Sequence, residues 1–279
     1  MEVLNNIFLY KGIKINYREM GNGEPIILLH GFGGNLNSWR LISESLAGKN
    51  KLFLIDLKGF GLSDKPLDDK YSASDQADII SDFILKNKFQ NLTLIGHSLG
   101  GAIALITFIK LMNEKNNPIK SLILISSPAY KQRVPEFTRL LEIPLLNKLL
   151  LIFLPVHFGA KIVLKRCFFD DKKISEKIIE NYSDFLESAG SFHALITTAK
   201  KILPKNIDEI TLKYKDIKIP VLLIWGENDQ TIPLSIGQRL EKDLPNAKLV
   251  VIPECGHLPP EEKPQELVKI ISEFLSNLQ

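Results

Sequence analysis

The sequence has little cysteine, and its two cysteines are not arranged to organise a fold. Cys167 and Cys255 are the only ones among 279 residues, and they are far apart, without the spacing of a metal site. Small secreted domains are rich in disulfides, whereas two distant cysteines are typical of a reducing compartment. We therefore expect two free thiols, no metal and a cytoplasmic protein, although a single disulfide between them remains compatible with the sequence.

The chain also lacks a targeting signal and a long apolar run. No basic residue precedes the first short apolar stretch, so we expect no secretory signal. The most apolar stretch, residues 145–158, is interrupted by Asn147, Lys148, Pro155 and His157. A membrane-spanning helix needs about 18 uninterrupted apolar residues. We expect no membrane span, and we interpret this stretch as the interior of a helical segment rather than as a lipid-binding surface.

Charge of one sign is not concentrated anywhere. The chain carries 35 Lys and Arg against 32 Asp and Glu, for a net charge of +3, and the basic residues are scattered. A nucleic-acid-binding domain normally shows a basic cluster, so we expect no nucleic-acid partner. We found no internal repeat. With 45% hydrophobic residues, the chain is long enough for one large domain with an inserted subdomain.

Apolar runs alternate with helical patterns in the first and last parts of the chain. Strands are expected at residues 7–10, 13–19, 25–29, 51–55, 92–95, 121–125, 220–225 and 247–252. Helices are expected from about 38, at 74–85 with Ser72 or Ser74 as N-cap, from 98 to about 112, at 234–244 and from 264. This alternation predicts an α/β fold with a mostly parallel sheet of about eight strands, covered by helices on both faces. The first two strands should form an antiparallel hairpin.

The alternation stops between residues 128 and 216. This stretch has helical patterns, no clear strand and four prolines, at positions 135, 144, 155 and 204. We expect an inserted helical cap over residues 128–216, and a core formed by residues 1–127 and 217–279. The cap would lie over the carboxyl ends of the strands, where parallel sheets place their binding sites.

A serine stands where one of the strands should meet a helix. The sequence Gly-His-Ser-Leu-Gly occupies residues 96–100, between an apolar run and a helical pattern. On so tight a turn the serine backbone is strained, and a Cβ at Gly96 or Gly100 would collide with a neighbouring strand or helix. The turn exposes the serine hydroxyl in front of a helix N-terminus, which favours a developing anion. We predict that Ser98 is a nucleophile.

A serine nucleophile needs a base, and the base needs an acid that orients it. Five histidines are available: His30, His97, His157, His193 and His257. His257 follows the last expected strand, and it is the predicted base. Asp229 and Glu227 both follow the preceding strand; we favour Asp229 as the acid.

Five motifs in this order give the chain a resemblance to the α/β-hydrolase superfamily over residues 7–278. They are His-Gly-Phe-Gly at 30–33, Asp-Leu-Lys-Gly-Phe-Gly-Leu-Ser at 56–63, Gly-His-Ser-Leu-Gly-Gly at 96–101, Gly-Glu-Asn-Asp at 226–229 and Gly-His at 256–257. The order Ser98, Asp229, His257 is the order of the catalytic residues in that superfamily. The Gly-x-x-Asp spacing of the superfamily is what favours Asp229 over Glu227.

The resemblance also implies roles for residues around the serine. The oxyanion hole would be formed by the backbone N–H groups of Phe32 and Leu99. His97 and Gly31 are candidate residues of the substrate pocket, although His97 would equally well pack beside the turn. His30 would brace the oxyanion loop. In the second motif, Asp56 and Ser63 are interpreted as residues that hold a turn together.

The resemblance implies a hydrolase that works without a metal or organic cofactor. Relatives that resemble epoxide hydrolases and haloalkane dehalogenases carry aspartate in place of Ser98, so this chain should form an acyl-enzyme. The favoured substrate is a small or medium, apolar carboxylic ester. One alternative is a carbon–carbon bond hydrolase of vinylogous diketones, although those relatives often carry asparagine where this chain has His97. A hydrolase-fold ligand receptor with slow turnover is another. A homodimer is possible.

Overall fold

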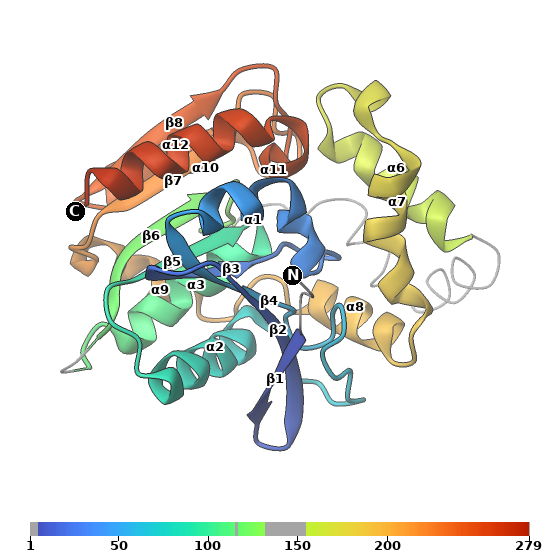
Figure 1. Cartoon of the computed structure of the whole chain (residues 1–279), viewed down its shortest axis with the longest axis horizontal. Helices are drawn as coiled ribbons and strands as arrows, with labels where there is room; N and C mark the ends of the chain where they lie inside the picture. The colour runs from blue at the N-terminus through green and yellow to red at the C-terminus, as the bar shows by residue number, and fades with distance from the viewer. Residues whose placement is uncertain (1–4, 115–116, 132–154, 279) are drawn as a thin grey trace.

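Eight strands form a single sheet in the computed structural model, which describes residues 5–114, 117–131 and 155–278 (Figure 1). The spatial order of the strands is β1-β2-β4-β3-β5-β6-β7-β8. Their bounds are β1 (Asn5–Tyr10), β2 (Ile13–Met20), β3 (Glu24–Leu29), β4 (Asn50–Ile55), β5 (Leu92–His97), β6 (Ile119–Ile125), β7 (Val221–Gly226) and β8 (Ala247–Ile252). The expected sheet of about eight strands is confirmed.

The sheet is parallel except around β2. Strand β2 pairs antiparallel with β1 and with β4, and all other neighbouring strands are parallel. The expected hairpin therefore exists, and it continues the sheet at the β4 edge. Every residue of β5 and of β7 is buried, because helices cover both faces of the central strands. Because β3 to β8 are parallel, their carboxyl ends all lie at the same edge of the sheet.

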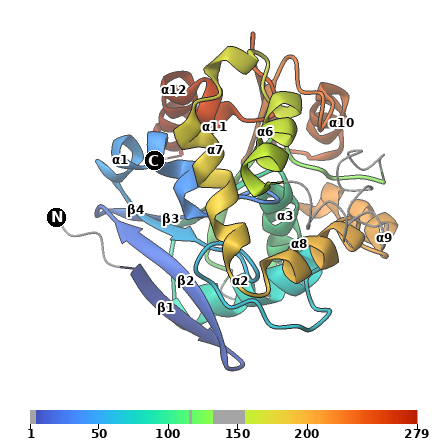
Figure 2. The same cartoon turned by 90° about the vertical axis from the view of Figure 1, so that its right-hand side faces the viewer.

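Among its described residues, the segment between β6 and β7 has helices joined by loops and no strand. Figure 2 shows α6, α7 and α8 together on one side of the molecule. The elements are α6 (Val156–Cys167), η2 (Asp171–Lys173), α7 (Glu176–Ser183), η3 (Asp184–Glu187), α8 (Ser191–Lys200), α9 (Ile207–Leu212) and η4 (Tyr214–Asp216). Residues 132–154, which hold most of the apolar stretch at 145–158, lie outside the described residues. The division into core and cap stays a prediction.

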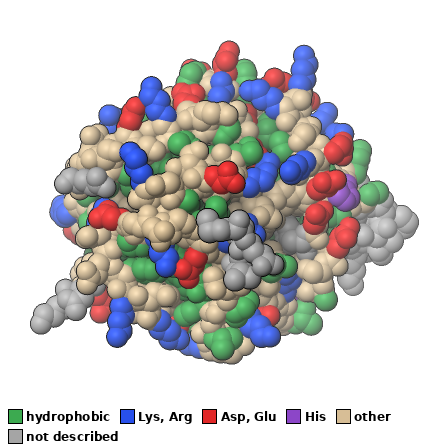
Figure 3. Space-filling view, in the orientation of Figure 1, with side chains coloured by type: hydrophobic (Ala, Val, Ile, Leu, Met, Phe, Trp, Pro, Cys, Tyr) green, Lys and Arg blue, Asp and Glu red, His purple; other side chains and the backbone are tan. Residues whose placement is uncertain are grey.

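The visible surface carries both signs of charge. On the face shown in Figure 3, lysine and arginine side chains are interspersed with aspartate and glutamate. Within the described part of the chain, no helix combines the length and the apolar character needed to cross a membrane.

Helices cover the sheet as two separate layers. One face is covered by α1 (Arg40–Ala47) and α12 (Pro264–Ser276), and the other by α2 (Ala73–Asn87), α3 (Leu99–Leu111) and α10 (Leu234–Asp243). Two short elements complete the described fold, η1 (Leu36–Trp39) and α11 (Pro259–Glu262).

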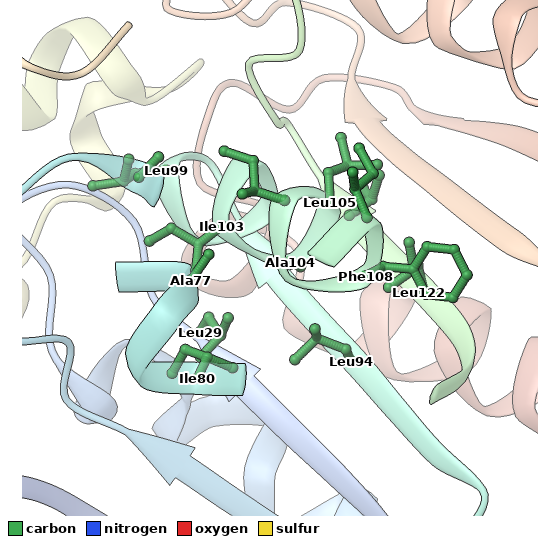
Figure 4. Close-up of a cluster of buried hydrophobic side chains, with 14 of the residues drawn as sticks. Leu29, Ala77, Ile80, Leu94, Leu99, Ile103, Ala104, Leu105, Phe108 and Leu122 are labelled. Atoms are coloured by element: carbon green, nitrogen blue, oxygen red, sulfur yellow. The ribbon is translucent and has the colours of Figure 1, made fainter. Parts of the chain in front are cut away.

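The larger core lies between α2, α3 and the sheet. Figure 4 shows Ile103 of α3, Ile80 of α2 and Leu94 of β5 among the side chains of this core. Helix α3 is buried along almost its whole length, which explains its apolar sequence. Burying one such side chain contributes roughly 1.5–3 kcal/mol, so this core holds the start of α3 firmly at the end of β5.

Candidate active site

Ser98 lies at a strained turn between β5 and α3. Its backbone has φ 51° and ψ −121°, and it is the N-cap residue of α3. A Cβ at Gly96 would overlap the carbonyl oxygen of Gly100, and a Cβ at Gly100 would overlap that of Leu29 in β3. Both glycines are therefore required by the close approach of helix and strands, as the sequence predicted. The Ser98 side chain is partly exposed, whereas its neighbours in β5 and α3 are buried.

A chain of hydrogen bonds joins the three residues predicted to be catalytic. His257 Nε2 lies 3.0 Å from Ser98 Oγ, and His257 Nδ1 lies 2.8 Å from Asp229 Oδ2. The three residues follow β5, β7 and β8, so the parallel sheet brings them to one edge. Glu227, the competing acid, is exposed, whereas Asp229 is buried.

The surroundings of Asp229 keep its carboxylate ionised. Asp229 Oδ1 accepts hydrogen bonds from the backbone N–H groups of Thr231 and Ile232, each at 2.9 Å. Burial opposes ionisation, but His257 and these donors outweigh it and hold the pKa of Asp229 below its ordinary value. An ionised Asp229 requires the proton of a neutral His257 to lie on Nδ1. His257 Nε2 is then free to accept the hydroxyl proton of Ser98.

His97 packs against His257 and bonds to its backbone. The two ring centroids lie 5.1 Å apart, and His97 Nε2 donates to the carbonyl oxygen of His257 at 2.7 Å. Burial first, and then the neighbouring His257, lower the pKa of His97 to about 3. His97 is therefore neutral at pH 7, and it does not compete with His257 as a base. Its predicted place in the substrate pocket remains a prediction.

The loop after β3 runs beside the serine. A Cβ built on Gly31 would lie 3.0 Å from His97 Nδ1 and 3.1 Å from the Cβ of Ser98. The next residue, Phe32, is half-buried, and Leu99 is the first residue of α3. The structure thus brings the two backbone segments of the predicted oxyanion hole close to the predicted nucleophile.

His30 holds the loop after β3 in place through hydrogen bonds of both ring nitrogens. Its Nε2 accepts the backbone N–H of Leu57 at 3.0 Å, so its Nδ1 carries the proton and donates to the carbonyl oxygen of Gly31 at 2.8 Å. Burial lowers the pKa of His30, which fits a neutral bracing side chain. The ring of Phe60 packs edge-on against the ring of His30 at 5.6 Å.

Asp56 and Ser63 hold a turn away from the serine. The Asp56 carboxylate accepts from the backbone N–H groups of Leu36 and Leu62 and from the side-chain amide of Asn16. Ser63 Oγ donates to the carbonyl oxygen of Asp56 at 2.6 Å. These contacts agree with the interpretation of the second motif as a structural turn.

The side chains of the remaining histidines and of both cysteines are not part of the hydrogen-bonded chain of Ser98, His257 and Asp229. His157 contacts Ser183 Oγ and His193 contacts the carbonyl oxygen of Asp68, both outside the hydrogen-bonded chain. Cys167 and Cys255 are free and buried, and burial raises the pKa of each thiol. The thiols are therefore protonated and poor nucleophiles at pH 7.

Sequence reasoning missed the residues that hold the loop of His257. The carboxylate of Glu262, in α11, accepts the backbone N–H groups of Gly256 and Leu258, on either side of His257. The N–H of His257 itself donates to the carbonyl oxygen of Cys167, at the end of α6. The position of Glu262, five residues after a catalytic candidate, offered a signal. Cys167 offered none, because its contact is through the backbone and distant in sequence.

An apolar cavity borders the helix that begins at Ser98. Its lining includes one face of α3 and residues of the segment between β6 and β7: Ala102, Leu105, Ile106, Tyr130, Ile207 and Tyr214. Ala102 lies one helical turn after the serine, because its N–H donates to the carbonyl oxygen of Ser98. Ser98 itself is not among the residues that line the cavity.

The chain is similar to curated hydrolases over nearly its whole length. It is 28% identical to "Lipase 1" of Psychrobacter immobilis over 294 residues, which cover 99% of this chain and 85% of the relative. It is 26% identical to the 2-hydroxy-6-oxo-6-(2'-aminophenyl)hexa-2,4-dienoic acid hydrolase of Metapseudomonas resinovorans, covering 95% of this chain and 88% of the relative.

The fold is shared with solved hydrolase structures. The epoxide hydrolase CorEH superimposes with a TM-score of 0.86 at 20% identity, and all of both chains is covered. At this identity the likeness concerns the fold alone. The family described as "alpha/beta hydrolase fold" matches residues 24–152 and 168–264. With its sheet order, its helical layers and this match over most of its length, the chain belongs to the α/β-hydrolase family.

Proposed function

We propose that the protein hydrolyses carboxylic esters of small to medium, apolar substrates through an acyl-enzyme. The observation that carries the proposal is the continuous chain of hydrogen bonds from Asp229 through His257 to Ser98. Such a chain activates a serine that is otherwise a poor nucleophile at neutral pH.

In the first half of the proposed reaction, Ser98 Oγ attacks the ester carbonyl while His257 Nε2 takes its proton. The tetrahedral intermediate collapses when the carbon–oxygen bond to the alcohol breaks, and His257 gives its proton to the leaving alcohol. In the second half, His257 removes a proton from water, which attacks the acyl-enzyme. The acid leaves, Ser98 regains its proton, and Asp229 stabilises the transient imidazolium throughout.

We assign the oxyanion hole to the backbone N–H groups of Phe32 and Leu99. Support comes from the place of Gly31, where an added Cβ would lie 3.1 Å from the Cβ of Ser98, and from the position of Leu99 directly after Ser98. In other serine hydrolases, removing one such donor costs about 3 kcal/mol of transition-state stabilisation. Because these donors belong to the backbone, substituting the Phe32 side chain should change the pocket more than it changes the hole.

The preference for apolar esters is supported by the lipase among the relatives. We further propose that residues 128–216 act as a cap over the site. The bond between the Cys167 carbonyl and the His257 N–H supports this, because it joins the end of α6 to the catalytic loop. Every step of the mechanism uses side chains, backbone and water, so it requires no metal or organic cofactor.

Carbon–carbon bond hydrolysis is a second candidate. The observation that favours it is the relative from Metapseudomonas resinovorans, a dienoic acid hydrolase, at 26% identity. The same three residues serve both reactions, so the substrate decides between them. A ligand receptor on this fold would modify its ligand about once, whereas an enzyme turns over many times.

The first test is kcat/KM for p-nitrophenyl esters from acetyl to dodecanoyl. We expect turnover with a maximum at one chain length, and loss of at least about 1,000-fold in Ser98→Ala. Ser235→Ala, at an exposed position in α10, is the control and should leave kcat/KM unchanged. Folded protein without turnover on any ester would contradict the proposal, and vinylogous diketones would then be assayed, followed by ligand binding.

A further inference from the structure

The buried side chain of Glu262 forms hydrogen bonds with the loop that carries His257. Glu262 is only 6% exposed. Its Oε1 accepts the N–H of Gly256 at 3.0 Å and that of Leu258 at 3.2 Å, and its Oε2 accepts the N–H of Phe169 at 2.7 Å. One carboxylate thus binds both sequence neighbours of His257 and also Phe169, which follows α6.

The charge of Glu262 is stabilised by backbone donors. Burial raises the pKa of Glu262, and the N–H groups of Phe169, Gly256 and Leu258 oppose that effect. Its neighbour Glu261 is also buried, but it forms a two-pronged ion pair with Arg40 at 2.5 and 2.7 Å. Two adjacent glutamates of α11 therefore have separate tasks: one pairs with a cation and the other binds the catalytic loop.

The end of α6 lies against this loop with no spare room. The His257 N–H donates to the Cys167 carbonyl at 2.6 Å. A Cβ on Gly256 would overlap that same carbonyl oxygen and would lie 2.8 Å from the N–H nitrogen of Phe169. His97 holds the carbonyl of His257 from the other side. The backbone of His257 is thus fixed at both its N–H and its C=O.

We propose that Glu262 is a positioning residue that couples the end of α6 to the orientation of His257. The inference rests on the proposed function. The carboxylate orients His257 by binding its neighbours, and its bond to Phe169 means that the same group also holds the segment between β6 and β7. A change in the path of residues 167–169 therefore moves the imidazole that serves Ser98.

The experiment compares Glu262→Gln with Glu261→Gln. Glutamine keeps the shape, but its amide group turns a donor toward backbone N–H groups that are themselves donors. We expect Glu262→Gln to lower kcat by about 100-fold with KM nearly unchanged, because a small misplacement of a catalytic group has this effect. Glu261→Gln should lower the melting temperature and leave kcat unchanged.

A second readout needs no turnover. The Nδ1 proton of His257, shared with Asp229, gives a strongly downfield NMR resonance that is assigned by its absence in His257→Gln. We expect this resonance to shift or broaden in Glu262→Gln and to stay in place in Glu261→Gln. If the wild type hydrolyses no ester, the resonance still decides the positioning role, while the proposed function fails separately.

A pair of variants at Phe169 covers the case in which Glu262→Gln does not fold. Phe169→Pro removes the N–H that Glu262 accepts, together with the phenyl ring. The preceding Phe168 has an extended backbone, φ −83° and ψ 145°, that suits a following proline. Phe169→Ala is the control, because it keeps the N–H and removes a side chain that is 48% exposed. A shifted resonance in Phe169→Pro alone supports the coupling. An unchanged resonance and kcat in Glu262→Gln, or in Phe169→Pro when Glu262→Gln does not fold, overturns it.

Discussion

Ser98 has the conformation of a residue held in place by its neighbours. A positive φ in a residue other than glycine costs free energy, and it persists where the surrounding structure determines it. Here β5, α3 and the end of β3 approach one another so closely that Gly96 and Gly100 have no room for a side chain. The strain at the serine is thus maintained by two glycines that do not touch a substrate.

Gly96→Ala should therefore destabilise the fold. The added methyl group would overlap the Gly100 carbonyl, and overpacking of this kind costs about 1–3 kcal/mol. Gly48→Ala is the matched control, because Gly48 has φ −59° and a Cβ there would have only one contact, at 3.4 Å from the Ser45 carbonyl. Urea denaturation measures both, and equal free energies of unfolding would contradict the steric argument.

At the scale of residues, the sequence predicted what local spacing encodes. Gly-x-Ser-x-Gly identifies the turn at Ser98 because the collision avoided at Gly96 is with Gly100, four residues later, whereas the collision avoided at Gly100 is with the distant Leu29. His257 and Asp229 were predicted from their places after strands, and the structure brings both within hydrogen-bonding distance. Glu262 was missed because its partners are backbone N–H groups, so that only its position five residues after His257 pointed to it.

At the scale of secondary-structure elements, the structure shows which residue caps the beginning of α2. The sequence left Ser72 and Ser74 as alternative N-caps of α2. The structure selects Ser72, whose hydroxyl accepts the N–H of Asp75 while the Asp75 carboxylate accepts the N–H of Ser72. Such a capping box satisfies two backbone donors that the first turn of a helix leaves unpaired.

Ser72→Ala should lower the free energy of unfolding by about 1 kcal/mol, the usual cost of losing an N-cap. Ser74→Ala, inside the first turn of α2, should leave the free energy of unfolding unchanged or raise it slightly, because alanine favours helix. Chemical denaturation of the two variants in parallel is the measurement. A larger loss in Ser74→Ala would show that the cap has been misassigned.

Strands were easier to predict than short helices. All eight predicted strands are present, and central ones such as β5 and β7 are apolar because helices cover both of their faces. The pairing of β2 with β4, and the short helix α11, were not predicted. Both depend on contacts between residues distant in sequence, and two prolines followed by two glutamates resemble an ordinary loop until their burial is known.

For the molecule as a whole, the pairing of Asp229 with His257 links the proposed site to stability. Its pKa in the folded protein is below the ordinary value of 3.8. The ionised carboxylate therefore contributes stability above about pH 4, and this contribution is lost as the pH falls through the folded pKa.

The comparison of wild type with Asp229→Asn isolates that contribution. We expect the wild type to have the higher free energy of unfolding at pH 6–7, and the difference to shrink below about pH 4 as Asp229 becomes protonated. Denaturant titrations at several pH values check this. A difference that stays constant down to pH 2 would mean that Asp229 does not titrate in linkage with folding.

The path of the chain between β6 and β7 suggests how variants with a different substrate specificity could be engineered. These strands are adjacent and parallel, with Leu122 opposite Val221, so the segment between them leaves at the carboxyl end of β6 and returns to the amino end of the neighbouring strand, β7. A chimera could replace this segment without changing the order of the strands in the sheet. Among the contacts that it would have to reproduce is one short connection, in which the Cys167 carbonyl accepts the His257 N–H and the Phe169 N–H donates to Glu262. Because main-chain atoms make that connection, donor segments of unrelated sequence are admissible if their backbones follow the same course.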